Sequence, residues 1–215
     1  MIWLSHSISS NTQEYAGGKS FSIKKTRSMS KGDSCNQISI SFSNHFGTHV
    51  DAPRHFIEDG KEVSDYYNVN DWVFTHPLLL DIPTTELGVI NEESFLTIDK
   101  HLDVDLLLIR TGFEKHRGRD AYWKMTPVFD QSIVNAIDFL YPNVRAIALD
   151  TISISSLSDR QKGRECHRAI LGRDIRIFED ISMKNIYKPL KKVIALPLRI
   201  ECVDGVPLTI IGYFE

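Results

Sequence analysis

Three short, continuous apolar runs constrain the possible fold of this chain more than any other feature of its sequence. They span residues 77–82, 104–111 and 144–150. Apolar runs of this length without alternation are typical of strands that are covered on both faces. The segments between them predict a short helix over 91–99 and a longer one with Thr126 as N-cap, Pro127 at its first position and an end before Tyr141. Strand, helix and strand in succession predict an α/β fold.

Length and composition indicate one globular domain over residues 1–215. Hydrophobic residues make up 42% of the chain and charged residues 25%, with a net charge of −3. A nucleic-acid partner, which needs a basic face, is therefore not expected. No apolar stretch is long enough to span a membrane, and the N-terminus lacks a signal-peptide pattern. Cys35, Cys166 and Cys202 form no close pair and indicate reduced thiols in a cytoplasmic protein.

A polar segment near residue 50 concentrates potential metal ligands. Within eleven residues it holds three of the eight histidines of the chain and one aspartate: His45, His49, Asp51 and His55. Imidazole nitrogens and carboxylate oxygens suit zinc and, with more oxygen ligands, manganese. On a local strand, His49 and Asp51 point to the same face. Spacing leaves a second interpretation open, in which the histidines lie on a surface loop and Thr48 and Asp51 cap a turn.

This segment must bend if its histidines share a site. Fully extended, it would separate His45 from His55 by about 33 Å, at about 3.3 Å per residue. Gly47 and Pro53 are the residues best suited to a bend. A helix is disfavoured because glycine, threonine and valine lie among the ligands. We therefore expect a strand and a turn, with the glycine bend bringing His45 back to the strand.

The same segment reads His-x-Gly-Thr-His-x-Asp-x-Pro-x-His from residue 45 to residue 55. This string resembles the signature of the metal-dependent cyclase family, which includes bacterial kynurenine formamidases and isatin hydrolases. The resemblance implies a swivelling β/β/α fold with a mixed sheet and flanking helices. It also implies a two-metal site in which His45, His49 and Asp51 hold the first metal. Asp51 would bridge to the second metal, and His55 would be the catalytic acid and base.

The second group of ligands rests on the resemblance more than on spacing. Residues 160–173 predict a helix that contains His167, and residues 175–179 predict a strand that ends at Glu179. Alone, such a pair is better explained by an exposed helix histidine and a strand-end glutamate. In the cyclase family, a helix histidine and a glutamate about a dozen residues later bind the second metal, and His167 and Glu179 match them in type and spacing. The expected cofactor is two divalent metal ions, with zinc preferred to manganese.

The N-terminal region supplies the predicted substrate contact. Residues 2–8 predict a strand and residues 9–18 a polar loop. The resemblance implies an aromatic residue in this loop, commonly between prolines, that lines the substrate pocket. Tyr15 is the best match, but Glu14 and Ala16 stand where prolines are usual. A half-exposed loop tyrosine without a role in binding is the alternative.

Several other segments have less definite interpretations. The alternation over 37–43 predicts a half-buried strand, and the basic residues within 21–31 predict a solvated hairpin edge or, alternatively, a site for a substrate carboxylate. Residues 196–201 and 204–207 resemble the closing strand pair and turn of the family, with Cys202 where glycine is frequent. Three further histidines lie in polar, loop-like surroundings and are predicted to be at the surface: His76, His101 and His116.

Two metals at this ligand set would activate a water molecule for attack on a carbonyl carbon, and the resemblance implies that the reaction is hydrolysis of an amide. The resemblance implies an N-formyl arylamine as a small-molecule substrate and a homodimer or homotetramer as the assembly. The same scaffold acting on a cyclic amide or a lactone, as in isatin hydrolases, or as a biosynthetic cyclase is the second hypothesis. The third is a metal-binding protein without catalysis, which His55 argues against because a closed structural site needs no spare histidine.

Overall fold

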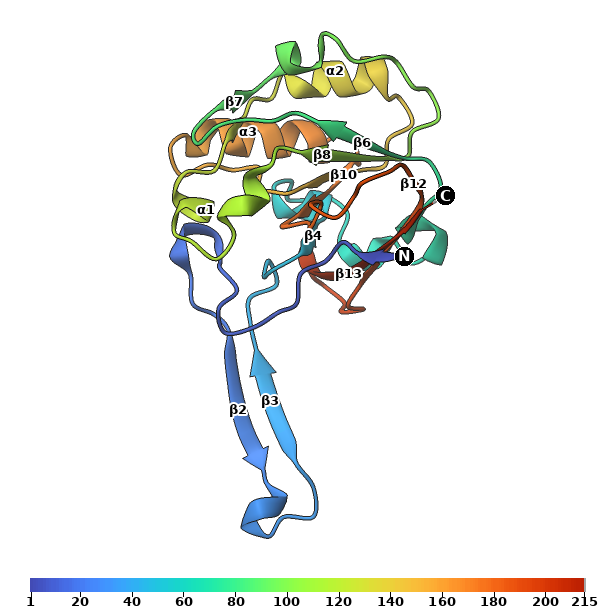
Figure 1. The fold of residues 1–215 in the computed structure, drawn as a ribbon. Helices are drawn as coiled ribbons and strands as arrows, with labels where there is room; N and C mark the ends of the chain where they lie inside the picture. Colours follow the sequence, from blue (N-terminus) through green and yellow to red (C-terminus); the bar gives the residue numbers. More distant parts are fainter. Residues whose placement is uncertain (215) are drawn as a thin grey trace.

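The computed structural model describes residues 1–214, and a nine-stranded mixed sheet forms its centre (Figure 1). The strand order is β5-β12-β13-β4-β11-β10-β8-β6, and β1 pairs with β13. The bounds are β1 Ile2–Trp3, β4 His49–Asp51, β5 Val73–Phe74, β6 Pro77–Asp81, β8 Leu106–Arg110, β10 Ala146–Leu149, β11 Arg176–Glu179, β12 Leu190–Pro197 and β13 Gly205–Phe214. The α/β prediction is confirmed.

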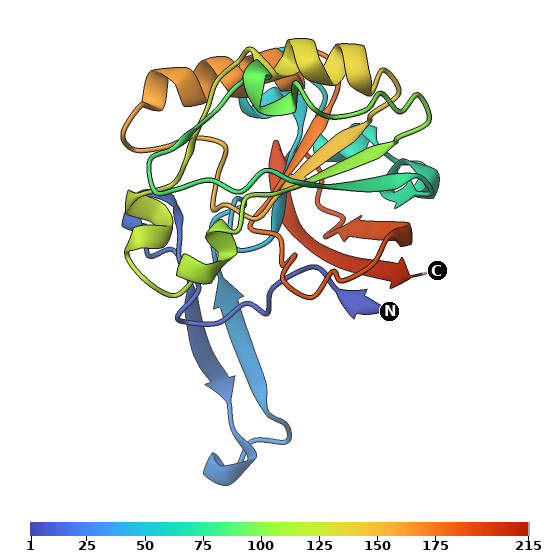
Figure 2. The same ribbon diagram turned by 45° about the horizontal axis from the view of Figure 1, so that its top comes forward.

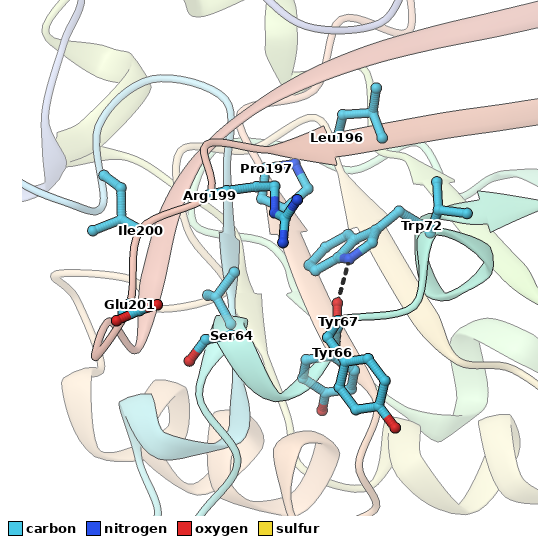
Figure 3. Close-up of a pocket in the computed structure, with 11 residues that line it drawn as sticks. Ser64, Tyr66, Tyr67, Trp72, Leu196, Pro197, Arg199, Ile200 and Glu201 are labelled. Carbon is cyan, nitrogen blue, oxygen red and sulfur yellow. Dashed lines mark hydrogen bonds between the residues drawn. The ribbon is translucent and has the colours of Figure 1, made fainter.

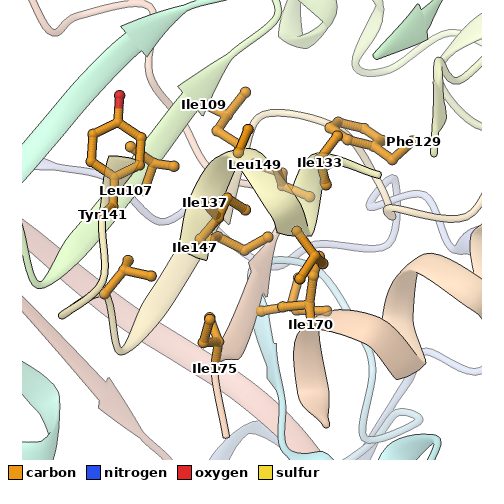
Figure 4. Close-up of a cluster of buried hydrophobic side chains, with 14 of the residues drawn as sticks. Leu107, Ile109, Phe129, Ile133, Ile137, Tyr141, Ile147, Leu149, Ile170 and Ile175 are labelled. Carbon is orange, nitrogen blue, oxygen red and sulfur yellow. The ribbon is translucent and has the colours of Figure 1, made fainter. Parts of the chain in front are cut away.

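One half of the sheet is parallel and carries the helices. Strands β6, β8, β10 and β11 run parallel, and α2 (Ile133–Leu140) and α3 (Arg160–Leu171) lie along one side of it (Figures 1 and 2). The three apolar runs form β6, β8 and β10, as predicted. Figure 4 shows why they are apolar: Ile133 and Ile137 of α2 pack with Leu107 and Ile147 of the strands in a fully buried cluster.

The other half is antiparallel and closes around a second core. Strand β4 pairs with β11 on one side and with β13 on the other, antiparallel in both cases. Val50, Phe178 and Val206, which meet across these strands, are buried in the second core. Arg176 is also buried here, with its guanidinium over the rings of Tyr66 and Trp72, so its charge is offset by cation–π contacts.

The longer helix begins later than predicted. Val128–Phe129 forms β9, which pairs with β7 (Val89–Ile90), and α2 starts at Ile133. Thr126 is not a cap: its hydroxyl donates to the Tyr122 carbonyl at 2.8 Å inside the core. The helix predicted over 91–99 is a single 3₁₀ turn.

Shorter elements complete the chain. A four-residue helix, α1 (Ala121–Lys124), was not predicted from the sequence. The strand predicted over 196–201 is wrong beyond Pro197, where β12 ends. The 3₁₀ turns are Tyr15–Gly17, Met29–Lys31, Pro53–His55, Val63–Asp65, Val69–Trp72, Glu92–Phe95 and Phe113–His116. In the described part of the chain, every helix is too short or too polar to cross a bilayer.

Strands β2 (Ser22–Arg27) and β3 (Gln37–Ser41) form a hairpin that projects far from the sheet (Figures 1 and 2). The strand predicted at 37–43 is therefore present, but its predicted half-burial is wrong: Ile38 is 54% exposed and Ile40 is 50% exposed. Alternation in the sequence indicates that a strand has an apolar face. Within one chain, no described element packs on the apolar face of β3. The basic residues of β2 are exposed on the same arm.

Candidate metal centre

Strand β4 places two of the predicted ligands on one face of the sheet. His49 lies opposite Glu179 of β11, and Asp51 lies two residues further along β4. Because side chains alternate along a strand and paired residues share a face, His49, Asp51 and Glu179 converge. The helix α3 adds His167 from above this face, and all four side chains are buried.

The distances within this group fit a single divalent metal ion. His49 Nε2 lies 3.4 Å from both Asp51 Oδ1 and Glu179 Oε2. His167 Nε2 lies 3.5 Å from Asp51 Oδ2 and 3.4 Å from Glu179 Oε1. Two ligand atoms of a tetrahedral zinc ion are about 3.4 Å apart when each bond is about 2.1 Å long. The donor set and its spacing therefore suit such an ion.

Backbone carbonyls fix the orientation of the His49 and His167 rings by binding their Nδ1 atoms. His49 Nδ1 donates to the Gly47 carbonyl at 2.8 Å, and His167 Nδ1 donates to the Gly163 carbonyl at 2.7 Å. In the neutral rings, this leaves Nε2 as the lone-pair nitrogen that faces the carboxylates, which is the form that a metal needs.

His45 and His55 form the second part of the cluster. His45 Nδ1 lies 2.7 Å from Asp51 Oδ1, and the two imidazole rings are 3.9 Å apart between centroids. Gly47, with φ 65°, and the turn Pro53–His55 provide the predicted bend. His45, Asp51 and His55 offer ligand atoms within 4.8 Å of one another. Asp51 therefore touches both parts of the cluster.

Asp204 is a site residue that sequence reasoning missed. Its Oδ2 accepts from His45 Nε2 at 3.0 Å and from His55 Nδ1 at 2.7 Å. In the sequence, Asp204-Gly205 has the signature of a turn, so Asp204 was interpreted as a turn residue and its contact with the histidines was not predicted. Gly205 is required by close packing, because a Cβ there would lie 2.3 Å from His45 Cε1.

The carboxylates and imidazoles perturb one another strongly. Burial alone would lower the pKa of His45, but Asp51 and Asp204 raise it to about 9. At His167, burial likewise lowers the pKa, but Asp51 and Glu179 raise it to about 9. Burial favours the neutral acid at Asp51, yet the neighbouring imidazoles hold the pKa of Asp51 well below its usual range. In the metal-free cluster, the imidazole rings therefore bind protons, whose positive charge takes the place of a metal cation.

A cavity of about 210 Å³ opens onto the cluster. Tyr15 lines it and packs against the small buried cluster of Phe113, Tyr122 and Ile152. Ala16 adopts φ 58°, which proline cannot adopt, so the absence of the usual proline agrees with the loop conformation. Ser153 also lines the cavity and donates to Glu179 Oε1 at 3.1 Å; nothing in the sequence singled it out.

Other predicted residues lie away from the cluster. His76 and His101 are exposed, as predicted, but His116 is half-buried over the Phe113 ring, so its surface prediction is wrong. Lys24 and Lys25 lie on the hairpin, and within one chain they do not line the cavity.

A second, larger cavity of about 670 Å³ lies beside the end of β12. Figure 3 shows Tyr66, Tyr67 and Trp72 on one side of it and Arg199 on the other. None of the predicted site residues lines this cavity.

The fold and the buried cluster define a class: an α/β protein whose central sheet carries a histidine–carboxylate centre for a divalent metal ion. The chain belongs to the family described as "Putative cyclase", which it matches over residues 2–156.

Relatives of known name agree with this family. The chain is 29% identical over 210 residues to the kynurenine formamidase of Bacillus cereus, a match covering 96% of this chain and 94% of that protein. It has a TM-score of 0.81 to isatin hydrolase A from Labrenzia aggregata bound to benzyl benzoate, with 18% identity and coverage of 100% of this chain and 93% of that one. A potential metal-dependent hydrolase with cyclase activity has a TM-score of 0.75 and 20% identity, covering 98% of this chain and 96% of its own.

Proposed function

We propose that the protein is a metal-dependent amidohydrolase that cleaves an N-formyl arylamine or a similar amide. The observation that carries this is the convergence of His49, Asp51, His167 and Glu179 at distances that suit a metal, beside a cavity with an aromatic wall. The named relative from Bacillus cereus is a kynurenine formamidase, which supports an aryl formamide as substrate.

Two divalent ions, zinc in preference to manganese, complete the proposed centre. One would be held by His49, Asp51, His167 and Glu179, and the second by His45 with Asp51. This grouping differs from the one that the family resemblance implied, because His49 lies beside Glu179 and His45 lies beside Asp204. When bound, the metals acidify a water molecule and polarise the substrate carbonyl.

The residues of the chain supply orientation and proton transfer. His55 lines the cavity, and Asp204 fixes its Nδ1 at 2.7 Å, so Nε2 is the ring nitrogen available to a substrate. In this proposal it delivers the proton to the leaving nitrogen. Tyr15 and Phe56 line the cavity and confine an aryl group.

A cyclic amide is the second candidate substrate. Two observations favour it: the cavity is small, at about 210 Å³, and two isatin hydrolases share the fold with TM-scores of 0.81. Opening of a lactam ring would use the same residues, with the leaving nitrogen retained in the product.

The hairpin supports the proposed homodimer or homotetramer. Ile23, Ile38 and Ile40 on β2 and β3 are each at least half exposed, with Ile23 at 57%. An apolar face of this kind on a projecting arm is stabilised when a second copy covers it. Three unpaired cysteines support the cytoplasm as the compartment.

The test combines metal analysis with a substrate panel. Purified protein should contain about two equivalents of zinc or manganese per chain, and Asp51→Ala should remove both because Asp51 touches both parts of the cluster. The metal-loaded protein should hydrolyse N-formylkynurenine, isatin or a simple lactone, with the first preferred. A protein that binds no transition metal after reconstitution, or that turns over none of the three, would contradict the proposal.

A further inference from the structure

The arm formed by β2 and β3 has an apolar face that no described element of the chain covers. Every residue of both strands is exposed, and the arm projects away from the sheet in both views (Figures 1 and 2). Ile23 pairs with Ile40 across the arm, and Ile38 lies two residues from Ile40 on β3, so the three isoleucines share one face. A two-stranded hairpin alone is at best marginally stable in water. The arm therefore requires a surface outside its own chain, because it points away from the rest of the molecule.

The large cavity beside the end of β12 is an apolar surface that is also uncovered. Its volume is about 670 Å³, and its lining residues fall within 63–72 and 196–201; we call this surface the aromatic groove. Figure 3 shows the rings of Tyr66, Tyr67 and Trp72 on one side of it. Of the lining residues, Tyr67 is 86% exposed and Val69 is 63% exposed. Exposed aromatic and aliphatic side chains around a hollow are typical of a surface that binds another protein.

The arm and the aromatic groove carry opposite charges. Residues 22–41 of the arm hold four basic residues and one acidic residue. Residues 62–72 beside the groove hold three acidic residues and no basic one, and Glu201 adds a carboxylate to the lining, in which Arg199 is the one basic residue. Asp65 and Glu201 are exposed, and within residues 1–214 neither forms a salt bridge. Opposite charges of this kind steer two surfaces together and fix their register.

Lys25 distinguishes between two ways in which a second copy could cover the isoleucines. It pairs with Ile38 across the arm and therefore lies on the apolar face. If two arms packed face to face, their lysines would be brought together, which costs free energy. In the aromatic groove, the aliphatic part of Lys25 would contact apolar side chains while its ammonium group met carboxylates. The charges therefore favour the groove over a second arm.

We propose that the arm of one chain docks in the aromatic groove of a second copy, with Ile23, Ile38 and Ile40 against Tyr67 and Val69. Because each chain carries one arm and one groove, the contact is reciprocal, and two copies close into a dimer about a two-fold axis. This inference rests on the proposed homo-oligomer and identifies the surfaces that form it. It does not depend on the proposed reaction.

The test compares two double variants by sedimentation velocity over a series of protein concentrations. Ile38→Ser/Ile40→Ser changes the arm, and Tyr67→Ser/Val69→Ser changes the groove. All four side chains are exposed in the single chain, so both variants should keep the fold and the metal content of the wild type. Each should raise the Kd of the dimer at least about a hundredfold, because it removes apolar contacts from both copies of the interface.

The matched control is Leu96→Ser/Leu102→Ser. Both leucines are exposed and lie on neither surface, so this variant should dimerise like the wild type. If it dissociates as the other two do, loss of exposed apolar area in general would explain the result, and the inference would be overturned.

A mixture of the arm variant and the groove variant gives the decisive readout. Each lacks one surface and keeps the other, so the two can form a heterodimer with one intact arm–groove contact. An equimolar mixture should therefore contain dimer at concentrations where either variant alone is monomeric. Packing of arm on arm predicts a groove variant that stays dimeric, and packing of groove on groove predicts an arm variant that stays dimeric. Either result, or a mixture that remains monomeric, would overturn the inference and leave the proposed homo-oligomer standing, whereas a wild type that is monomeric at every concentration would overturn both.

Discussion

The charge of Asp51 should control the stability of the metal-free protein in a pH-dependent way. We consider Asp51→Asn, which keeps the shape of the side chain and removes its charge. Asp51 is buried and lies 2.7 Å from His45 Nδ1. The pKa of His45 is about 9 in the folded protein, against about 6.5 in an unfolded chain. Without the aspartate charge, burial would lower the folded pKa of His45 and only Asp204 would still raise it, so the pKa should fall from about 9 towards its unfolded value.

The size of the effect follows from linkage. A pKa of about 9 instead of about 6.5 corresponds to roughly 2.5 kcal/mol of folding free energy at pH 7. Because the folded pKa is raised, this contribution is fully present below pH 6.5 and is lost as the pH rises through 9. Through His45, Asp51→Asn should therefore cost up to about 3 kcal/mol near pH 6, less where Asp204 compensates, and much less above about pH 9.5.

Urea denaturation of metal-free protein at pH 6 and pH 9.5 measures this difference. Asp150→Asn is the control, because Asp150 is equally buried but accepts hydrogen bonds from Thr111 and Gly112 and from no histidine. Its cost should persist at pH 9.5. A cost of Asp51→Asn that is the same at both pH values would refute the argument.

Three further predictions concern single residues. His55→Ala should leave metal content nearly intact and lower turnover by about 10²–10⁴; loss of metal together with folding stability would make His55 a ligand instead. Tyr15→Ala should raise KM for an aryl amide by a factor that corresponds to the loss of about 0.5–1.5 kcal/mol of ring contact, with kcat much less affected. It should not change the KM of small aliphatic formamides. Gly205→Ala should lower metal content, measured by elemental analysis, because its Cβ would lie 2.3 Å from the His45 ring; full metal occupancy in this variant would show that the ring is not held there.

The elements that the sequence predicted well are strands that pack against both cores. Strands β8 and β10 are buried almost throughout, and β6 at the edge of the sheet packs half-buried leucines on both faces, so the apolar character of these runs reports their structure directly. The start of α2 was misplaced because proline after threonine is a helix-start signal, whereas here Val128 bonds to the Gly88 carbonyl in a short strand. Local signals cannot show such long-range pairing.

The candidate site also contains residues that the sequence could predict and one that it could not. His45, His49, Asp51 and His55 stand close together in the sequence, so their convergence was open to prediction. Asp204 comes from the other end of the chain, and the pairing of β13 with β4 brings it to His55. The exposure of Ile38 could not be predicted either, because alternation shows that a face is apolar and not what covers it.

The position of β4 determines when the metal centre can form during folding. This strand of three residues, His49–Asp51, is held by β11 on one side and β13 on the other. Both partners lie in the last quarter of the sequence, so closing these pairings requires ordering most of the intervening chain. During synthesis, residues 45–55 leave the ribosome long before the strands that fix them. The complete metal centre, which includes Glu179 of β11, can therefore form only after these late strands have paired with β4.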